Sequence, residues 1–459
     1  HCSKRTSKRM KELLPYLKQV ACNDDSLRYY QFENKLKIYN EWQNCKSLML
    51  QMPTGTGKTR LFVSIVNDIL ACRMHDGIIP SVLLLVHRKE LVNQIAETLA
   101  SYGLEYGIIQ AGAEESRFCH IQVASVQTLV RRLQRWGRVR FEFVIIDEAH
   151  HTPSPTYMKI LDAFSDSKLL GVTATPHRLD YWGFAHIFDK LIVSPDPMEF
   201  IKSGFLSNYD YYSVPPECPI VDEINAIPIE KGDFAEDSLI RLLDCGSIRS
   251  QVVDSYMKYG CGKKAIVYTI NKAHNKHLCE EYQKRGINAV TIDCDTPQSE
   301  RKQLLDEFKK GKIQIICNVN ILSEGFDCPD VEVVQITRPT YSLSMYLQQV
   351  GRGLRVFPGK DKSVFIDNVG SYLRFGLPSE HRSWEKYFDR KPTSVRQQIQ
   401  GSTDTDPQQD GKIEEGNEEV RLVYSTTPEE TVEKATGTSN TQPIVNKKLA
   451  PILLLASYL

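Results

Sequence analysis

A glycine-rich turn, Thr54-Gly55-Thr56-Gly57-Lys58-Thr59, is the feature that most limits what this chain can fold into. It follows the apolar run Ser47–Met52, which is typical of a buried strand, and it precedes apolar residues at helical spacing. Between a strand and a helix, such a turn lets backbone N–H groups surround phosphate oxygens. The lysine then reaches the β- and γ-phosphates, and the following threonine binds Mg²⁺. We therefore predict that ATP is bound by Thr54, Gly55, Thr56, Gly57, Lys58 and Thr59.

A second polar cluster, Asp147-Glu148-Ala149-His150, follows the apolar run Phe141–Ile146. A carboxylate at the end of such a strand can hold the magnesium ion of a bound nucleotide, and we assign this role to Asp147. The adjacent Glu148 can orient or deprotonate the attacking water. The two clusters together predict hydrolysis of Mg-ATP.

Far downstream, Arg352 and Arg355 lie three residues apart, which places them on one face of a helix. Arginine carries a planar, permanently charged fork that matches phosphate oxygens. Such arginines act as fingers on the γ-phosphate in related nucleotide hydrolases. We predict that Arg352 and Arg355 complete the catalytic site of an ATP-driven motor.

The pattern along the chain predicts two α/β units of parallel sheet. The expected strands are continuous apolar runs rather than alternating ones, which is typical of sheets covered on both faces. They are Ser47–Met52, Val82–Val86, Phe141–Ile146, Leu169–Val172, Ala265–Tyr268, Ala289–Ile292, Ile313–Cys317, Val331–Ile336 and Ser363–Ile366. We place the first unit at residues 26–200 and the second at 201–375, with the nucleotide in a cleft between them.

Three other segments have a different character. Residues 1–25 form a basic segment, and over residues 1–18 we expect a solvated leader helix or, as the alternative, a weak phosphate-contacting arm. The proline-rich stretch Val214–Ile229 is expected to be an irregular connection. The remaining residues, 376–459, form a C-terminal extension whose acidic, polar part we expect to be largely disordered from about residue 393.

Beyond the glycine-rich turn and the acidic cluster, five segments complete a series in the order known from one family. They are Leu27-Arg28-Tyr29-Tyr30-Gln31, His87-Arg88-Lys89-Glu90-Leu91, Ala124-Ser125-Val126-Gln127-Thr128, Thr173-Ala174-Thr175-Pro176 and Ser323-Glu324-Gly325-Phe326-Asp327. With Gln348-Gln349-Val350-Gly351-Arg352-Gly353-Leu354-Arg355, the chain resembles a DEAD/DEAH-box-type superfamily 2 helicase. The resemblance implies two tandem RecA-like domains. It also resembles, at subgroup level, RadD-like bacterial DNA-repair helicases and the motor subunits of restriction systems, although the chain lacks the cysteine-rich C-terminal part of the RadD type.

The same resemblance implies that Gln348 joins the two arginines in the catalytic site, and it implies roles for nine further residues. Adenine and nucleotide contacts are implied for Gln31, Gly325 and Asp327. Coupling of hydrolysis to domain movement is implied for His150, Thr173 and Thr175. Contacts with a nucleic-acid backbone are implied for Arg88, Ser125 and Gln127.

Charge, cysteine content and hydropathy limit the class of protein and its cellular compartment. The formal net charge is zero, so any surface that binds nucleic acid must be local. The 12 cysteines include no Cys-x-x-Cys pair, which argues against a zinc module and favours reduced thiols in the cytoplasm. No apolar stretch approaches the roughly 20 residues of a membrane span. The chain opens with His1, which leaves open a fragment or a trimmed product.

Several alternatives remain open at this stage. DNA is favoured over RNA as the substrate, but the motifs contact backbone rather than bases. The chain could also be the motor of a restriction or defence complex, with repair or restriction proteins as partners, or an ATP-gated clamp on duplex. An arginine-rich segment around Trp136 could bind phosphates while the indole stacks on a base, although a solvated helix end accounts for it equally well.

Overall fold

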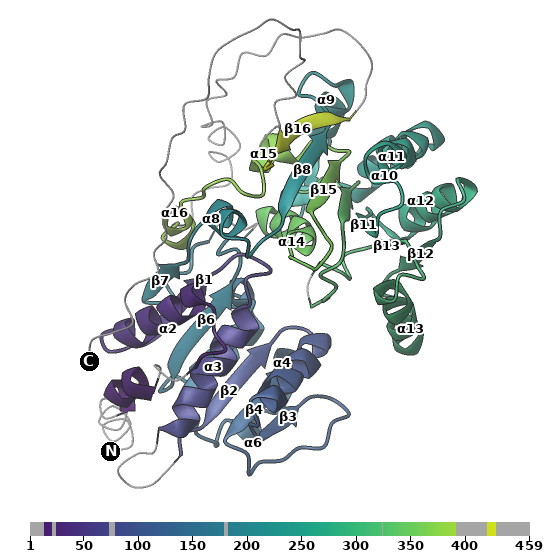
Figure 1. Ribbon diagram of the computed structural model, residues 1–459. Helices are drawn as coiled ribbons and strands as arrows, with labels where there is room; N and C mark the ends of the chain where they lie inside the picture. The colour runs from purple at the N-terminus through teal and green to yellow at the C-terminus, as the bar shows by residue number, and fades with distance from the viewer. Residues whose placement is uncertain are drawn as a thin grey trace, which may run out of the picture. The chain divides into compact units, whose positions relative to one another are not determined.

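The computed structural model describes residues 13–20, 24–72, 79–178, 182–323, 325–391 and 420–427 (Figure 1). Within them the chain forms two seven-stranded sheets, each covered by helices. We call the first sheet with its helices the first lobe, and the second sheet with its helices the second lobe. This arrangement confirms the predicted pair of parallel α/β units.

The first sheet is parallel throughout, in the order β3-β4-β2-β5-β6-β1-β7. Its strands are β1 (Ser47–Gln51), β2 (Val82–Val86), β3 (Tyr106–Ile109), β4 (Ile121–Ser125), β5 (Phe143–Asp147), β6 (Lys168–Thr173) and β7 (Lys190–Val193). Strands β1, β2, β4 and β5 are buried at every position, which explains their unbroken apolar sequence. The carboxyl ends of these parallel strands all meet at one edge of the sheet, which is where ligands bind in folds of this kind.

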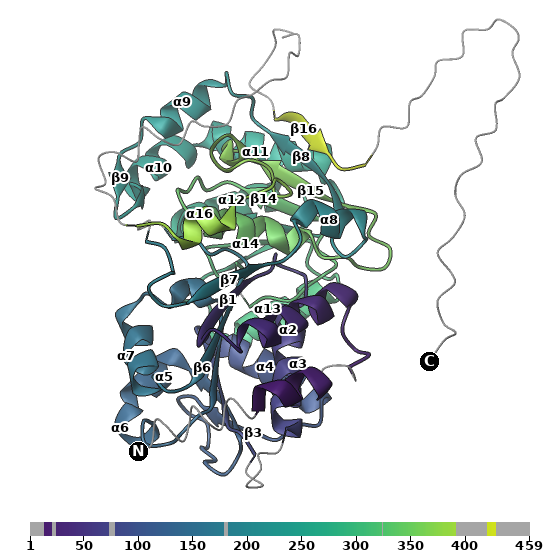
Figure 2. The same ribbon diagram turned by 90° about the vertical axis from the view of Figure 1, so that its left-hand side faces the viewer.

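Helices cover both faces of the first sheet (Figure 2). One face packs against α2 (Tyr29–Glu41), α3 (Lys58–Ala71) and α4 (Lys89–Ser101), and the other against α5 (Val126–Arg131), α6 (Leu133–Trp136) and α7 (Pro155–Ala163). Alternate residues of one strand enter different cores. Leu48 and Leu50 of β1 contribute to the core that contains α3, whereas Met49 contributes to the core that contains α7.

The second sheet has the order β12-β13-β11-β14-β15-β8-β16. Its strands are β8 (Asn208–Ser213), β11 (Ala265–Tyr268), β12 (Ala289–Ile292), β13 (Ile315–Asn318), β14 (Val333–Ile336), β15 (Lys362–Asp367) and β16 (Arg421–Ser425). All pairs are parallel except β16, which runs antiparallel to β8. A small hairpin pairs β9 (Ile229–Glu230) with β10 (Asp233–Phe234).

The remaining helices flank or connect these sheets. They are α8 (Pro197–Lys202), α9 (Pro219–Asn225), α10 (Glu236–Leu243), α11 (Gly246–Tyr259), α12 (Lys272–Lys284), α13 (Gln298–Lys309), α14 (Leu343–Gly353), α15 (Ser371–Phe375), α16 (Trp384–Phe388) and the short 3-10 helix η2 (Ala149–His151). Among the described residues, no helix is both long and apolar enough to cross a membrane.

Three expectations about the less regular segments were wrong where the structure describes them. Residues 13–20 are helical, but Leu13 and Leu17 are buried in the first core rather than solvated. The proline-rich connection contains helix α9, whose first residue, Pro219, suits the first turn of a helix. Strand β16 lies inside the segment expected to be disordered and pairs with β8 (Figure 1). Residues 392–419 and 428–459 lie outside the described residues.

Candidate functional site

The glycine-rich turn joins β1 to α3 and adopts the conformation that its glycines allow. Gly55 and Gly57 have φ angles of 88° and 82°, a region where a side chain is strained. The Thr56 hydroxyl donates to the Pro53 carbonyl at 2.7 Å and closes the turn. The Lys58 ammonium is drawn back over the loop, 3.3 Å from the Met52 carbonyl oxygen. A phosphate entering the turn would find a cation and a helix N-terminus together.

Gln31 lies directly against this turn. Its amide nitrogen donates to the Thr56 and Gly57 carbonyls at 3.1 and 3.0 Å, and its amide oxygen accepts from the Arg28 N–H at 2.9 Å. The Tyr30 hydroxyl also donates to Thr56, at 2.8 Å. The nitrogen end of the Gln31 amide therefore supports the phosphate-binding turn, while the oxygen end is held by the start of α2. Its contact with adenine stays a prediction, and the amide oxygen keeps a second lone pair with which it could accept from the base.

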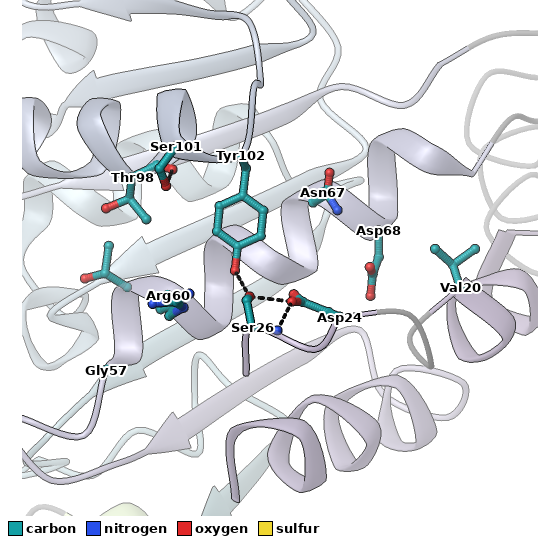
Figure 3. A pocket seen from close by; sticks show the side chains of 11 residues that line it. Val20, Asp24, Ser26, Gly57, Arg60, Asn67, Asp68, Thr98, Ser101 and Tyr102 are labelled. Atoms are coloured by element: carbon teal, nitrogen blue, oxygen red, sulfur yellow. Dashed lines mark hydrogen bonds between the residues drawn. The ribbon is translucent and has the colours of Figure 1, made fainter. Parts of the chain in front are cut away.

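A cavity of about 810 Å³ opens beside the start of α3 (Figure 3). Its lining comes from α3, from the end of α4 and from the segment before α2, and includes Gly57, Thr59, Arg60, Asn67, Ser26 and Tyr102. The Ser26 and Tyr102 hydroxyls lie 2.8 Å apart at one side. The cavity adjoins the predicted phosphate-binding turn through Gly57 and Thr59, whereas its other lining residues belong to no motif. Among these is Asp68, a carboxylate set among the apolar residues of α3, which is buried and also lines the cavity.

The acidic cluster is held at the end of β5, beside β6. Glu148 has a φ of 51°, the left-handed region, and its N–H donates to the Asp147 carboxylate at 3.1 Å. The His150 Nδ1 atom lies 3.0 Å from the Thr173 hydroxyl and 3.3 Å from a Glu148 carboxylate oxygen. The Thr173 hydroxyl in turn accepts from the Thr175 N–H at 3.1 Å. Hydrogen bonds thus connect the acidic cluster to the strand end that carries both threonines.

Helix α14 and the residues just after it bring the paired arginines to the phosphate-binding turn. Arg352 lies in the helix, but Arg355 lies two residues beyond its end, so the prediction that one helix face carries both was wrong. A methyl group on Gly55 would lie 3.4 Å from the Arg355 Cγ atom, and one on Gly351 would lie 2.6 Å from the Thr54 Cβ atom. The Arg355 guanidinium forms an ion pair with Asp327, and its Nε atom is buried with no hydrogen-bond partner in the described part of the chain. The predicted proximity of Arg355 and Lys58 is therefore present, and Arg355 retains a donor suited to an anionic oxygen.

Arg352 is buried and holds a neighbouring loop. Its guanidinium donates to the Ser323 carbonyl at 2.6 Å and to the Phe326 carbonyl at 2.7 Å. Gly325 and Asp327 lie in this loop, which Arg352 ties to α14, whereas Glu324 lies outside the described residues. Gln348 is also buried, and its amide nitrogen has no partner among the described residues.

The charges of the site influence one another. Burial lowers the pKa of Lys58, the Glu148 and Asp147 carboxylates oppose this shift, and the positive charges of Arg352 and Arg355 add to it. Two carboxylates and three cations from both lobes therefore share one electrostatic environment. Hydroxyl and carboxylate oxygens of the Thr59 and Asp147 type suit Mg²⁺, which is held by one or two protein ligands plus phosphates. No group of three or more His, Cys, Asp or Glu occurs among the described residues that could hold a metal by itself.

Of the three residues expected to bind nucleic acid, one contacts the second lobe, one is buried and one is exposed. The Arg88 guanidinium donates to the Ile321 carbonyl at 3.2 Å and to the Asn320 carbonyl at 3.4 Å, so it bridges the two lobes. Ser125 is only 1 % exposed at the end of β4, while Gln127 is exposed. Their contacts with nucleic acid stay predictions.

The suggestion that Trp136 stacks on a base was wrong. The indole is fully buried in the core beneath α5 and α7. Two of the surrounding arginines, Arg132 and Arg135, instead pair with Glu115. The structure thus favours the simpler interpretation of this segment, an apolar anchor with charged neighbours at the surface.

Comparison with known proteins agrees with this geometry. Residues 24–178 match the family described as "Type III restriction enzyme, res subunit", and residues 249–357 match "Helicase conserved C-terminal domain". The two matched segments contain the phosphate-binding turn and the paired arginines, respectively. The chain belongs to the superfamily 2 helicases. It is accordingly an ATP-dependent enzyme of the helicase type.

Individual relatives share most of the described chain. A 51.5 kDa protein of a Lactococcus phage is 34 % identical over 74 % of this chain and 70 % of its own length. IRC3 of Saccharomyces cerevisiae, whose name describes an ATP-dependent helicase, is 31 % identical over 72 % of this chain. The chain spans 49 % of the length of that yeast relative.

Among solved structures, a fragment described as the HsdR subunit of a Vibrio vulnificus type I restriction enzyme has a TM-score of 0.62. It is 23 % identical and covers 80 % of this chain and 68 % of its own. At this level of identity, the similarity concerns the two-lobed fold.

Proposed function

We propose that this helicase uses ATP hydrolysis to move along DNA. The observation that carries the proposal is the position of Arg355, whose stem lies against Gly55 of the other lobe. An arginine from one lobe at the phosphate site of the other makes hydrolysis sensitive to how the lobes are arranged. Any change in that arrangement can in turn be passed to contacts with a bound strand.

The residues of the site suggest how hydrolysis proceeds. Backbone N–H groups of Gly55 to Lys58 and the Lys58 ammonium hold the β- and γ-phosphates, and Glu148 orients the attacking water. The Arg355 guanidinium leaves Asp327 for the γ-phosphate oxygens and stabilises the charge that develops there. Arg352 contributes by holding the 323–326 loop, and thereby Asp327, close to the site.

Thr59 and Asp147 are the residues that would hold magnesium. When bound, the ion neutralises charge on the β- and γ-phosphate oxygens. The Glu148 N–H, which donates to Asp147, restricts the orientation of that carboxylate. The His150–Thr173 hydrogen bond would report the state of this site to the strand end that carries Thr175.

DNA is the favoured substrate because the larger matched segment belongs to a family of restriction-enzyme subunits, and restriction enzymes act on DNA. Two relatives point the same way by name: a DNA 3'-5' translocase of Sulfurisphaera tokodaii, 23 % identical, and a type I restriction endonuclease subunit of Escherichia coli, 24 % identical. An rRNA helicase of Kluyveromyces lactis is 23 % identical, so RNA has to be tested beside DNA.

The test measures ATP turnover with no nucleic acid, single-stranded DNA, duplex DNA and RNA of the same sequence. We expect DNA to stimulate turnover most, Lys58→Ala to abolish it, and Arg355→Ala to lower it by on the order of 10³-fold. Lys276→Ala, a change at an exposed site on α12, is the matched control and should behave as the wild type. Turnover that ignores nucleic acid and survives Lys58→Ala would refute the proposal.

A second candidate is the motor subunit of a restriction complex, favoured by the match over residues 24–178. The described residues contain no cluster of carboxylates and histidines that could hold nuclease metals. A nuclease would therefore have to come from elsewhere. Reconstitution with a defined nuclease or specificity subunit, followed by DNA cleavage that depends on Lys58, would distinguish this role from a free-standing translocase.

A further inference from the structure

The short segment between the lobes, Phe205 to Ser207, lies between the supports of the phosphate-binding turn and the segment that carries Arg355. It follows α8 in the first lobe and precedes β8 in the second, and it lies outside both segments matched to known families. The Phe205 and Leu206 N–H groups both donate to the Phe200 carbonyl, at 2.8 and 3.1 Å. The next N–H, that of Ser207, donates instead to the Leu354 carbonyl at 2.8 Å. The backbone thus passes from one lobe to the other between Leu206 and Ser207.

Phe205 anchors this segment to the residues that support the phosphate-binding turn. Its ring lies 4.9 Å from the ring of Tyr30 and 5.6 Å from that of Tyr29, and the Arg28 guanidinium lies over it at 5.0 Å. Tyr30 donates its hydroxyl to Thr56 of the turn. Phe205 is therefore joined to the turn through one aromatic contact and one hydrogen bond.

Leu206 touches the turn itself. It is 1 % exposed, and a methyl group on Gly55 would lie 3.3 Å from the Leu206 Cδ2 atom and 3.4 Å from the Arg355 Cγ atom. Leu206 and Arg355 thus lie against the same glycine. They also flank one backbone hydrogen bond, because Ser207 follows Leu206 and its acceptor Leu354 precedes Arg355.

We propose that Leu206 is a positioning residue for the finger arginine Arg355. An arginine stem has four rotatable bonds, and only one end of the Arg355 guanidinium is held by Asp327. The Leu206 side chain supplies an apolar wall that confines the stem beside Gly55. The Leu206 N–H is bonded to the first lobe and the Ser207 N–H to the second. Leu206 therefore fixes the position of Arg355 relative to the phosphate site. This inference rests on the proposed ATPase.

The decisive experiment truncates Leu206 and measures whether the loss of kcat depends on the presence of Arg355. Leu206→Ala should lower the kcat for ATP by roughly 10- to 100-fold, since an error of about 1 Å can cost that much, while the KM changes little. Leu206→Met, which conserves volume, should retain most of the activity. In an Arg355→Ala background, adding Leu206→Ala should cause no further loss.

The matched control is Leu278→Ala, the same truncation of a fully buried leucine on α12 in another core. It should lower the melting temperature as Leu206→Ala does but leave kcat unchanged. Equal kcat losses for both truncations, or the same loss with and without Arg355, would overturn the proposal. If Leu206→Ala does not fold, Leu206→Val in the same two backgrounds serves instead. A wild-type chain whose turnover does not depend on Lys58 would overturn the proposed function as well, which separates the two failures.

Discussion

At the scale of single residues, Gly55 meets two separate constraints: a φ of 88° and the close approach of Leu206 and Arg355. Gly112 shares the first constraint, with a φ of 85°, but has nothing within 4 Å of an added methyl group. We expect Gly55→Ala and Gly112→Ala each to lose about 1–2 kcal/mol of stability from the left-handed backbone. Only Gly55→Ala should also abolish ATP turnover. Urea unfolding and steady-state kinetics on both variants check this, and equal activity would contradict it.

Residue chemistry was predictable wherever a spacing implied it. A lysine at the start of a helix after two glycines indicates a phosphate site, and a carboxylate at the end of a buried strand indicates a magnesium ligand beside it. The partners of the side chains were not predictable, because they depend on tertiary packing. Both Gln31 amide hydrogens are donated to backbone carbonyls of the turn, and Trp136 is buried although five arginines surround it in sequence. Neither fact leaves a mark on the local sequence.

At the scale of elements, a buried ion pair joins α2 to α3. The Lys35 ammonium lies 2.6 Å from the Asp68 carboxylate, which also accepts from the Tyr39 hydroxyl at 2.6 Å. Removing one partner leaves an uncompensated buried charge, so we expect Lys35→Met to lower the free energy of unfolding by about 3–5 kcal/mol. Lys35→Met combined with Asp68→Leu should recover much of that loss. Urea denaturation of the set tests this, and a double variant no better than the single one would count against the pair.

The loop after α14 contains a buried lysine, Lys360, whose side-chain nitrogen donates to the Arg355 carbonyl at 2.9 Å. Burial lowers its pKa from 10.5 to about 7. Between these values the unfolded chain binds more protons than the folded one, so the contribution of Lys360 to stability rises with pH from about 7 towards 10.5. The wild type should therefore gain stability relative to Lys360→Met between pH 7 and pH 9 in urea unfolding. A difference that stays constant with pH would contradict the assignment.

Strand prediction succeeded for the longest apolar runs but missed strands at both interior and edge positions, namely β3, β4, β7, β8 and β16. Val82–Val86 and Ala265–Tyr268 have the predicted bounds, because a strand buried at every position is an unbroken apolar run. The edge strand Ala289–Ile292 also has the predicted bounds, although its two middle residues are only half-buried. Edge strand β16 was missed, since its five residues are surrounded by acidic and polar sequence that dominates any average. Within those five residues Leu422, Val423 and Tyr424 favour a strand, but only pairing with β8 makes one.

At the scale of the whole molecule, two parallel sheets and the order of motifs predicted two lobes around one nucleotide. The segment that joins the lobes could not be predicted to matter, because Phe205 and Leu206 belong to no motif. Their importance comes from where the fold puts them: Phe205 lies against Tyr29 and Tyr30, and Leu206 lies beside Gly55 where Arg355 also approaches, all of them remote in sequence.

Arg88 bridges the two lobes and is also a predicted contact of nucleic acid. Its guanidinium donates to the Ile321 and Asn320 carbonyls, and nearby Gln94 donates to the Gly325 carbonyl. If Arg88 contacted a phosphate, Arg88→Ala would reduce the slope of log affinity for DNA against log salt concentration by about one. Because backbone carbonyls of the second lobe already engage Arg88, we expect Arg88→Ala to reduce the stimulation of ATP turnover by DNA and to leave that slope unchanged. Binding titrations across salt concentrations, with Lys276→Ala as the control for a lost surface charge, decide the matter. A slope smaller by about one would make Arg88 a phosphate ligand and would return to it the role that the sequence motif implies.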